Sequence, residues 1–528
     1  MRLLVGACAL TGALAAAPAA SAAPKLNFTP CGQTAAAAST ECATAVLPMD
    51  YDHPNGRKVH IAVARVPAAG TSKGTLFFNF GGPGGTAVDY LQFVGASGLW
   101  HNLNQHFDIL GFDPRGVGQS TPGIDCHANQ ETTGIYSQPF YTPLDVDAGA
   151  LIRKDTRYIA KCLSNGAILR HVSTANVARD MDQIRAGLGE RKLNYFGYSY
   201  GTFLGATYAS LFPHRYRAMV LDGPVDATDY INKPYQDLQE QTQGFERGLS
   251  RFFQACAAHQ EACSNFGGDD PWDAYDELVD QANASPIPAT GDTADPRPID
   301  GDDINFGSAS ELYAKEFWPE LGQALAMAAH GDGSLMRELV DSFYGRNDDG
   351  TYSNANDLYF TIGASEQRYP RKVQFYLDRG DEAWGLFDHE YWNNGYVELN
   401  YGLWPARDHD AYRGPFRVPG SAQTPLVVAT TYDPATPYHG ALRLVRDLRN
   451  ARLITMRGDG HTAYGGESAC IDSAVEAYVN TLALPAPGTK CKQDTGFEAP
   501  SAAAALTRTA RAATQNRKVL AGRVPGLR

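Results

Sequence analysis

A serine lies at the centre of the pentapeptide Gly-Tyr-Ser-Tyr-Gly, residues 197–201. The strand-like run LNYF leads into this pentapeptide, and the helix-like run TFLGATYASLF leads out of it. A G-x-S-x-G pattern at a strand-to-helix turn is typical of a nucleophile elbow, whose tight, strained turn exposes the serine hydroxyl. With 53 glycines in 528 residues, the pattern also arises by chance roughly a quarter of the time. Ser199 is therefore a candidate nucleophile whose assignment depends on partners elsewhere in the chain.

A serine hydroxyl becomes nucleophilic when a base takes its proton and an acid orients that base. Downstream, the strand-like run TPLVVATT ends just before Asp433, and ARLITM ends shortly before His461. The order serine, acid, histidine, with the last two each following a strand, fits such a triad. We predict Asp433 as the orienting acid and His461 as the general base. The alternatives are Asp459 as the acid, a turn-capping role for Asp433 before proline, and a surface-loop position for His461.

Glycines follow another strand-like run, TLFFNF, in the sequence Gly-Gly-Pro-Gly-Gly at residues 81–85. Backbone N–H groups on such a turn are able to approach a substrate carbonyl and stabilise the oxyanion that forms on it. We predict that Gly82, with Gly81 next in line, supplies one N–H group and Tyr200 the other. The run lacks the lysine of a phosphate-binding loop and the spacing of a dinucleotide-binding turn, so no nucleotide cofactor is expected.

These residues follow strand-like segments that alternate with helical ones. The helical segments are 177–189 and 438–449, and the strand-like segments are short apolar runs at 59–66, 75–80, 107–113, 193–197, 216–222, 424–431 and 451–458. Alternation of this kind predicts an α/β fold with a mostly parallel sheet that helices cover on both faces.

The middle of the chain has a different character. It is rich in Tyr, Trp, Asp and Glu, with a long helical pattern at 309–329 and an irregular Pro-rich loop at 285–298. We interpret 229–420 as a helical cap inserted into a core that is too long for one simple domain. The acidic stretch 346–357 lacks EF-hand spacing, so no calcium site is expected there. The predicted division is a leader at 1–22, core at 23–228, cap at 229–420, core at 421–492 and a basic Ala-rich tail at 493–528.

The two ends of the chain carry signals of their own. Residues 1–22 contain Arg2, an apolar stretch and a small-x-small cleavage site, which together predict a signal peptide rather than a membrane anchor. No later segment reaches the ~18 apolar residues that a span requires. We therefore expect export, to the medium or the periplasm. The basic tail is interpreted as a solvated end, with a processed extension or a surface-binding arm as alternatives.

Nine cysteines are present, and removal of the leader with Cys8 leaves an even number. In an exported chain, this pattern predicts disulfides, whereas no C-x-x-C or Cys/His cluster supports a zinc site. The cysteines fall into neighbouring pairs along the chain, and we predict Cys31–Cys42, Cys126–Cys162, Cys256–Cys263 and Cys470–Cys491. The net charge of −13 argues against nucleic-acid binding. No cofactor or metal is expected, and we predict a monomer.

Several motifs now occur in a fixed order behind the leader: NFGGPGG, GFDPRGVGQS, GYSYGT, VLDGPVD, DPATP and GDGH. Over about residues 40–492 this set resembles the secreted tripeptidyl aminopeptidases of the α/β-hydrolase superfamily, relatives of the prolyl aminopeptidases with a TAP-like C-terminal region. The resemblance implies an α/β-hydrolase fold and release of tripeptides from peptides with a free N-terminus. Two features depart from it: Phe80 stands where prolyl aminopeptidases have histidine, and the basic tail lies outside the pattern.

An aminopeptidase must recognise the α-ammonium group of its substrate, which calls for a carboxylate in a confined pocket. Glu366 is the first candidate, because relatives of this type tend to have an acid at that position. Glu311 and Asp226 follow, and each of the three is also compatible with an ordinary solvated acid.

The same catalytic residues would serve a carboxylesterase or lipase, because function depends on the cap rather than on the fold. The cap shows no broad Leu/Phe-rich face, which weighs against a lipase. A catalytically dead fold that acts as a binding protein is the remaining alternative, and the intact serine, aspartate and histidine set argues against it.

Overall fold

The computed structural model describes residues 23–497, apart from 35–37, 96–99, 138–145, 292–293 and 390–393. The predicted signal peptide and residues 498–528 of the predicted tail lie outside the described residues. Among the helices of the described segments, none is both long and apolar enough to cross a membrane.

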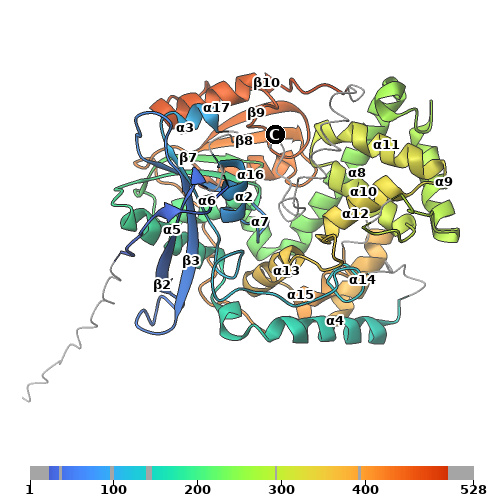
Figure 1. Ribbon diagram of the computed structural model, residues 1–528, viewed down its shortest axis with the longest axis horizontal. Helices are drawn as coiled ribbons and strands as arrows, with labels where there is room; N and C mark the ends of the chain where they lie inside the picture. Colours follow the sequence, from blue (N-terminus) through green and yellow to red (C-terminus); the bar gives the residue numbers. More distant parts are fainter. Residues whose placement is uncertain are drawn as a thin grey trace, which may run out of the picture.

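A ten-stranded sheet forms the centre of the larger part of the molecule, in the order β1-β2-β3-β5-β4-β6-β7-β8-β9-β10 (Figure 1). Neighbours from β5 to β10 pair in parallel, while β1, β2 and β3 form an antiparallel extension. The strands are β1 (Thr29–Pro30), β2 (Glu41–Pro48), β3 (Lys58–Val66), β4 (Thr75–Asn79), β5 (Asp108–Phe112), β6 (Leu193–Tyr198), β7 (Tyr216–Asp222), β8 (Leu426–Tyr432), β9 (Arg452–Asp459) and β10 (Lys490–Lys492).

Every strand-like run of the sequence analysis lies in this sheet, as β3 to β9. The buried central strands have apolar residues on both faces, which is why they read as continuous apolar runs. Phe77, for example, packs into the core on one face and its neighbour Phe78 into the core on the other. Three strands were not predicted from the sequence: β1, β2 and β10, which are short or lie at the margins of the sheet.

Helices cover both faces of the sheet. On one side Leu91 of α2 and Val475 of α17 pack against the strands, and on the other Met181 of α5 and Phe203 of α6 do so. These helices are α2 (Val88–Val94), α3 (His101–Asn104), α5 (Thr174–Gly187), α6 (Tyr200–Leu211), α16 (Tyr438–Leu448) and α17 (Ala469–Thr481), with the 3₁₀ helix η2 (Gly166–Arg170).

The second part of the molecule is helical and lies between β7 and β8 in the chain, beside the sheet part in Figure 1. It has a core of its own, which includes Phe252, Trp318 and Leu325. Its elements are α7 (Ala227–Asn232), α8 (Pro234–Ala258), η3 (Gln260–Cys263), α9 (Pro271–Ala284), α10 (Gly301–Glu311), η4 (Lys315–Phe317), α11 (Trp318–Ala329), α12 (Ser334–Tyr344), α13 (Ala355–Glu366), α14 (Val373–Trp384) and α15 (Leu399–Leu403).

One predicted helix is interrupted in the structure. The segment 309–329 is not one helix, because α10 ends at Glu311 and α11 begins at Trp318. Pro319 lies in the first turn of α11, where its missing N–H and fixed φ favour a helix start rather than a helix interior.

A second segment, which was not expected from the sequence, joins the helical part. This segment lies between β5 and β6 and includes α4 (Ala148–Leu163), which runs alongside α13 to α15 in Figure 1. Asp357 of α13 accepts hydrogen bonds from the Cys126 N–H at 2.9 Å, Gln130 Nε2 at 2.9 Å and the Tyr158 hydroxyl at 2.8 Å. A buried polar centre therefore ties the two segments together.

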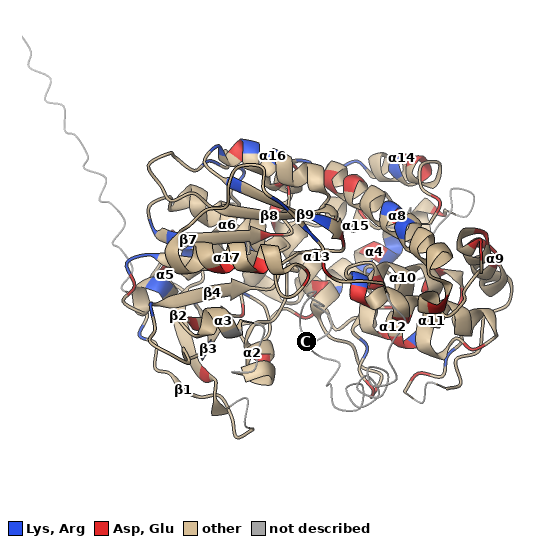
Figure 2. Cartoon of the chain, turned by 90° about the horizontal axis from the view of Figure 1, so that it is seen from above, with Lys and Arg blue, Asp and Glu red and all other residues tan. Residues whose placement is uncertain are grey.

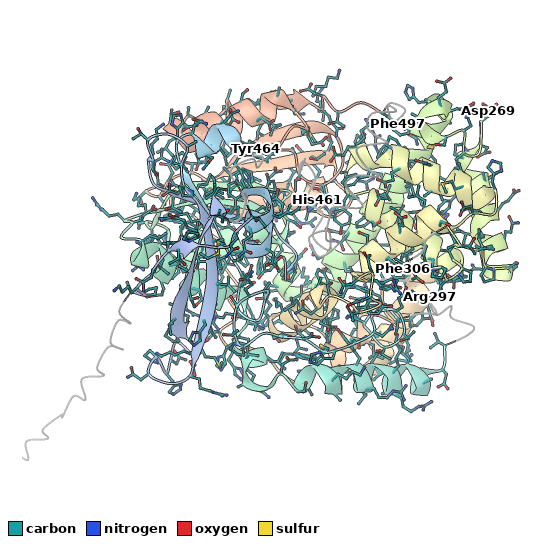
Figure 3. All side chains as sticks on the ribbon, viewed as in Figure 1. Asp269, Arg297, Phe306, His461, Tyr464 and Phe497 are labelled. Carbon is teal, nitrogen blue, oxygen red and sulfur yellow. A yellow bond between two sulfur atoms is a disulfide. The ribbon has the colours of Figure 1, made fainter. Side chains whose placement is uncertain are left out.

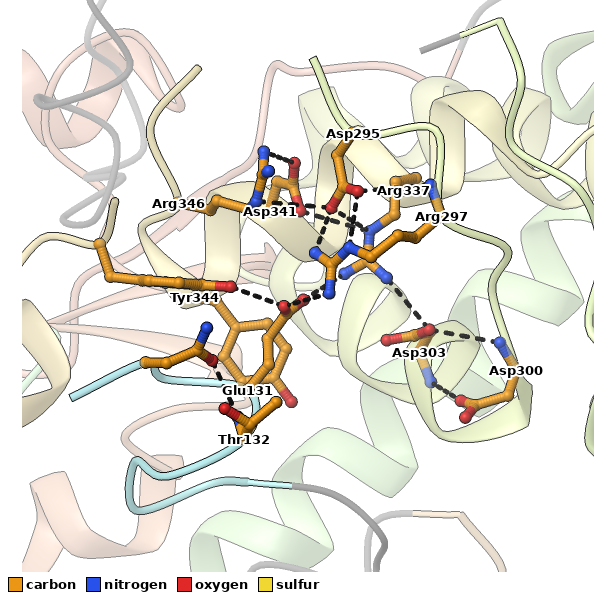
Figure 4. A network of polar contacts seen from close by, with 12 residues as sticks. Glu131, Thr132, Asp295, Arg297, Asp300, Asp303, Arg337, Asp341, Tyr344 and Arg346 are labelled. Carbon is orange, nitrogen blue, oxygen red and sulfur yellow. Dashed lines mark hydrogen bonds and ion pairs between the residues drawn. The ribbon is translucent and has the colours of Figure 1, made fainter. Parts of the chain in front are cut away.

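A network of ion pairs makes a second tie between these segments (Figure 4). Glu131 from the β5–β6 segment pairs with Arg337 of α12 at 2.8 Å and with Arg297 at 2.6 Å. Arg337 also lies 3.2 Å from Asp303 and 3.3 Å from Asp341. Buried charges are tolerated only when they are paired in this way.

The four predicted disulfides are present in the structure, as Cys31–Cys42, Cys126–Cys162, Cys256–Cys263 and Cys470–Cys491. Cys126–Cys162 holds the beginning of the β5–β6 segment to α4, and Cys470–Cys491 holds α17 to β10.

Candidate active site

Ser199 lies on a sharp turn between β6 and α6, at the carboxyl end of the parallel sheet. Its backbone has φ +54° and ψ −125°, a conformation that is strained for a residue with a side chain. The flanking glycines are needed here for steric reasons. A Cβ on Gly197 would lie 2.4 Å from the carbonyl oxygen of Gly201, and one on Gly201 would lie 2.8 Å from Asn79 Oδ1.

Asp433 follows β8 directly, and His461 follows β9 by two residues. His461 Nδ1 lies 2.9 Å from one oxygen of the Asp433 carboxylate and 3.0 Å from the other, and both side chains are buried. Nε2 of His461 is also buried and has no hydrogen-bond partner among the described residues. Figure 3 shows His461 at the boundary between the sheet part and the helical part.

The imidazole ring and Ser199 lie at the same edge of the sheet, on either side of the end of β7. The Ser199 N–H donates to the Asp222 carbonyl at 2.9 Å. The next residue, Gly223, is so close to the ring that a Cβ there would lie 2.8 Å from His461 Cε1. The structure thus places the predicted serine, aspartate and histidine at one edge of the sheet, with Asp433 and His461 in direct contact.

The Asp433 carboxylate is held by three further donors. It accepts the Ala435 N–H at 2.9 Å, the Thr436 N–H at 2.8 Å and the Thr436 hydroxyl at 2.8 Å. The Thr436 Oγ1 atom also lies 3.3 Å from His461 Nδ1. The sequence analysis missed Thr436, although its place three residues after an aspartate in DPATP is a recognisable turn pattern.

The alternative acid, Asp459, is engaged elsewhere. Its carboxylate forms an ion pair with Arg251 of α8 and lies 3.4 Å from Lys315 Nζ. Asp433, and not Asp459, is the carboxylate within hydrogen-bond distance of His461.

The predicted oxyanion donors lie beside the serine. Gly81 and Gly82 have φ values of +95° and +108°, and a Cβ on Gly81 would lie 2.9 Å from the Ser199 Cβ. The Gly81 N–H donates to Asn79 Oδ1 at 3.1 Å, which leaves Gly82 as the better-placed donor of the two. Tyr200 is the first residue of α6, where backbone N–H groups have no partner within the helix.

A cavity begins at Ser199, Gly82 and Tyr200 and extends between the two parts of the molecule. Its wall combines acids and aromatic rings, which suits a cationic ligand. The acids are Asp226, Asp237, Glu240 and Glu398, and the tyrosines are Tyr136, Tyr200, Tyr230, Tyr359, Tyr369 and Tyr401. In Figure 2, the ribbon of α8, which carries Asp237 and Glu240, is coloured for both acidic and basic residues.

Glu366, the first candidate for the ammonium site, does not line this cavity. It is buried behind Tyr200, where its two oxygens accept the Thr174 N–H at 2.8 Å and the Thr174 hydroxyl at 2.9 Å. Thr174 Oγ1 is in turn 2.6 Å from the Tyr200 hydroxyl. Burial raises the pKa of Glu366 to about 8. The geometry therefore gives Glu366 a structural place behind the cavity wall.

The other two candidates are also engaged. Glu311 is fully buried in α10, accepts the Ser310 hydroxyl at 3.1 Å and does not line the cavity. Asp226 does line the cavity, but it caps the start of α7 and forms an ion pair with Arg443.

Glu398 is one of the cavity acids that were not singled out from the sequence. One of its oxygens accepts Arg379 Nε at 2.9 Å and the Gly395 N–H at 2.8 Å. The other, Oε1, is buried and has no hydrogen-bond partner among the described residues. Burial raises the pKa of the Glu398 carboxyl, and a cation at Oε1 would counter that effect. No local pattern distinguishes this glutamate from the other acids of its segment.

Comparison with known proteins places these residues in a family. The model of the alpha/beta hydrolase fold matches residues 75–263, which include Ser199, and the model of the TAP-like protein family matches 390–491, which include Asp433 and His461. Serine protease Hip1 of Mycobacterium tuberculosis is 31% identical over 510 residues, spanning 93% of this chain and 95% of that protein. The chain belongs to the TAP-like α/β hydrolases.

Other relatives in this family carry different names. A tripeptidyl aminopeptidase of Streptomyces coelicolor is 31% identical over 463 residues, covering 85% of this chain and 83% of that protein. Carboxylesterase B of M. tuberculosis is 33% identical over 484 residues, covering 89% and 90%. The fold class and the family resemblance of the sequence analysis are thus confirmed, and this TAP-like hydrolase is a serine hydrolase of the peptidase type.

Replacing Thr436 tests the support of the Asp433 carboxylate. Thr436→Val removes the hydroxyl but keeps the shape, and a hydrogen bond to a charged group contributes about 1.5 kcal/mol or more. We expect kcat/KM for p-nitrophenyl acetate to fall about 10-fold. Thr436→Ser, which keeps the hydroxyl, should stay close to the wild type. Equal activity of the valine and serine variants would contradict this role.

Proposed function

We propose that this TAP-like hydrolase is an exported serine exopeptidase, which releases tripeptides from the free N-terminus of peptides through an acyl-enzyme. One observation carries the proposal: a single cavity joins Ser199 to a buried glutamate, Glu398, that has one oxygen without a partner among the described residues. The tripeptidyl aminopeptidase relative supports the reaction. The four disulfides support export, because such bonds form in oxidising compartments.

In the first half of the reaction, Ser199 Oγ attacks the carbonyl carbon of the third residue while His461 Nε2 takes the hydroxyl proton. Asp433 holds the Nδ1–H tautomer and stabilises the imidazolium. The negative charge that develops on the carbonyl oxygen is stabilised by the backbone N–H groups of Gly82 and Tyr200. The C–N bond then breaks, and His461 donates its proton to the leaving amine.

In the second half, water takes the place of the amine. His461 removes a proton from the water, whose oxygen attacks the tripeptidyl ester on Ser199. The C–Oγ bond breaks, the proton returns to the serine oxygen, and the tripeptide leaves with a free carboxylate. No step requires a metal or an organic cofactor.

Glu398 is our candidate for the substrate ammonium group. Arg379 and the Gly395 N–H hold one oxygen of Glu398 in place, the residue lines the cavity, and Oε1 remains an acceptor without a partner among the described residues. Tyr369 and Tyr401 line the cavity with it, and aromatic faces add cation–π attraction. A bound ammonium group would fix the N-terminus of the substrate. Three extended residues span roughly 10 Å, and the peptide bond at that distance from the ammonium group would be the one that is cut.

Glutamine at position 398 tests this assignment. Glu398→Gln keeps the shape but removes the charge, and a charge-assisted hydrogen bond is worth about 1.5–3 kcal/mol. We expect kcat/KM for a tripeptidyl coumarin amide with a free amino group to fall about 10- to 100-fold. The same variant should hydrolyse p-nitrophenyl acetate almost as well as the wild type. Glu366→Gln is the matched control, expected to stay within about threefold on the amide; the reverse pattern would return the role to Glu366.

The second candidate function is that of a carboxylesterase, favoured by the relative named Carboxylesterase B. A peptide of eight residues, supplied free and N-acetylated, separates the two functions when the products are followed by mass spectrometry. The proposal predicts successive tripeptides from the free peptide alone. Cleavage of both peptides would make the protein an endopeptidase, and turnover of p-nitrophenyl acetate with neither peptide cleaved would make it an esterase.

A further inference from the structure

Helix α8 of the helical part packs directly on the loop that carries Asp433. A Cβ on Gly244 of α8 would lie 2.3 Å from the carbonyl oxygen of Pro434, so the helix backbone touches the loop backbone. Gln241, one turn earlier, donates from Nε2 to the Ala435 carbonyl at 2.7 Å. The acid loop therefore rests against α8 at Pro434 and Ala435.

Two turns further along, Arg251 of α8 reaches both catalytic loops at once. Its guanidinium lies 3.6 Å from the ring centre of Tyr432, the residue before Asp433. The same group forms an ion pair with Asp459, two residues before His461, and its Nη2 lies 3.2 Å from Asp459 Oδ2. Only 5% of the Asp459 side chain is exposed, compared with 30% for Arg251, so solvent screens this pair less than a surface pair.

The histidine loop has further contacts with the helical part. The His461 N–H donates to the Tyr313 carbonyl at 2.6 Å, and the Tyr313 ring meets the imidazole edge to face at 5.7 Å. Lys315 Nζ lies 3.4 Å from the Asp459 carboxylate. On the other side, Gln493 accepts the Asp459 N–H at 3.0 Å. His461 is therefore placed as much by the helical part as by the sheet.

We infer that Arg251 is a positioning residue of the reaction: by bridging Tyr432 and Asp459, it sets the acid and histidine loops relative to each other and neutralises the charge of Asp459 near the imidazole. This inference rests on the proposed Ser-His-Asp mechanism. It gives the helical part a role in catalysis beyond lining the substrate cavity.

Several charged groups act on the His461 ring, and their signs decide the expected effect. Asp433 is hydrogen-bonded to the ring, and Asp222, held by the N–H groups of residues 463 and 464, interacts with it electrostatically. Asp459, two residues before His461, carries a further negative charge, which Arg251 and Lys315 balance. Removal of Arg251 leaves more negative charge beside the ring and favours the imidazolium. Because the neutral ring is the general base, activity then falls on acidification at a higher pH than in the wild type.

The experiment compares Arg251→Met, Arg251→Lys, Asp459→Asn and the double variant Arg251→Met/Asp459→Asn. The pH profile of kcat/KM is measured with p-nitrophenyl acetate, which depends on the catalytic residues and not on ammonium recognition. We expect Arg251→Met to lower kcat about 10-fold with little change in KM. It should also move the acid limb of the pH profile to higher pH by about half a unit. Asp459→Asn should move the limb down, the double variant should bring it back, and Arg251→Lys should keep it near the wild type.

Arg215→Met is the matched control. Arg215 also pairs with a buried aspartate, Asp182, and lies 5.2 Å over the ring of Phe212, but it precedes β7 at the opposite end of the sheet. Its loss should affect thermal stability as much as the loss of Arg251, with wild-type kcat and pH profile. The inference is overturned if Arg251→Met has the wild-type profile, or if kcat falls while the limb stays in place and the double variant does not restore it. A wild-type protein that hydrolyses neither ester nor peptide would instead refute the proposed function itself.

Discussion

The pair between His461 Nδ1 and the Asp433 carboxylate depends on a constraint of parallel sheets: strands that run in one direction end at one edge. β6, β7, β8 and β9 are neighbours that run in one direction, so Ser199 lies at the same sheet edge as Asp433 and His461 although it is far from them in the sequence. The other contacts at the site fix the positions of these side chains more closely. The strained turn raises the serine, and Thr436 with two backbone N–H groups fixes the carboxylate.

The helical part adds a cavity wall and loop contacts that the sheet alone does not provide. It supplies the wall of the substrate cavity, with Glu398 as an anchored acid, and it reaches back to the catalytic loops through Arg251 and the Tyr313 carbonyl. It is itself built from two chain segments, which are tied by Asp357 and by the ion pairs of Glu131. In the proposed mechanism, substrate recognition and the placement of the base thus both depend on the same packed helices.

Much of this could be read from the sequence, for identifiable reasons. The central strands are buried on both faces and so appear as short apolar runs, and the serine turn needs its glycines because neighbouring backbone leaves no room for a Cβ. The cysteines that pair are neighbours in the chain. What could not be read depends on contacts between distant segments. The sequence does not distinguish the surroundings of Glu366 and Glu398, yet Glu366 lies behind Tyr200 and Glu398 lines the cavity.

The most direct test of this account is to trap the acyl-enzyme. The purified protein is mixed with trialanine p-nitrophenyl ester at low pH, where deacylation is slow, and analysed by intact-mass and peptide mass spectrometry. The account predicts one added tripeptidyl unit, located on Ser199 and lost in Ser199→Ala. A burst of nitrophenol without any adduct on Ser199, or an adduct on another residue, would contradict it.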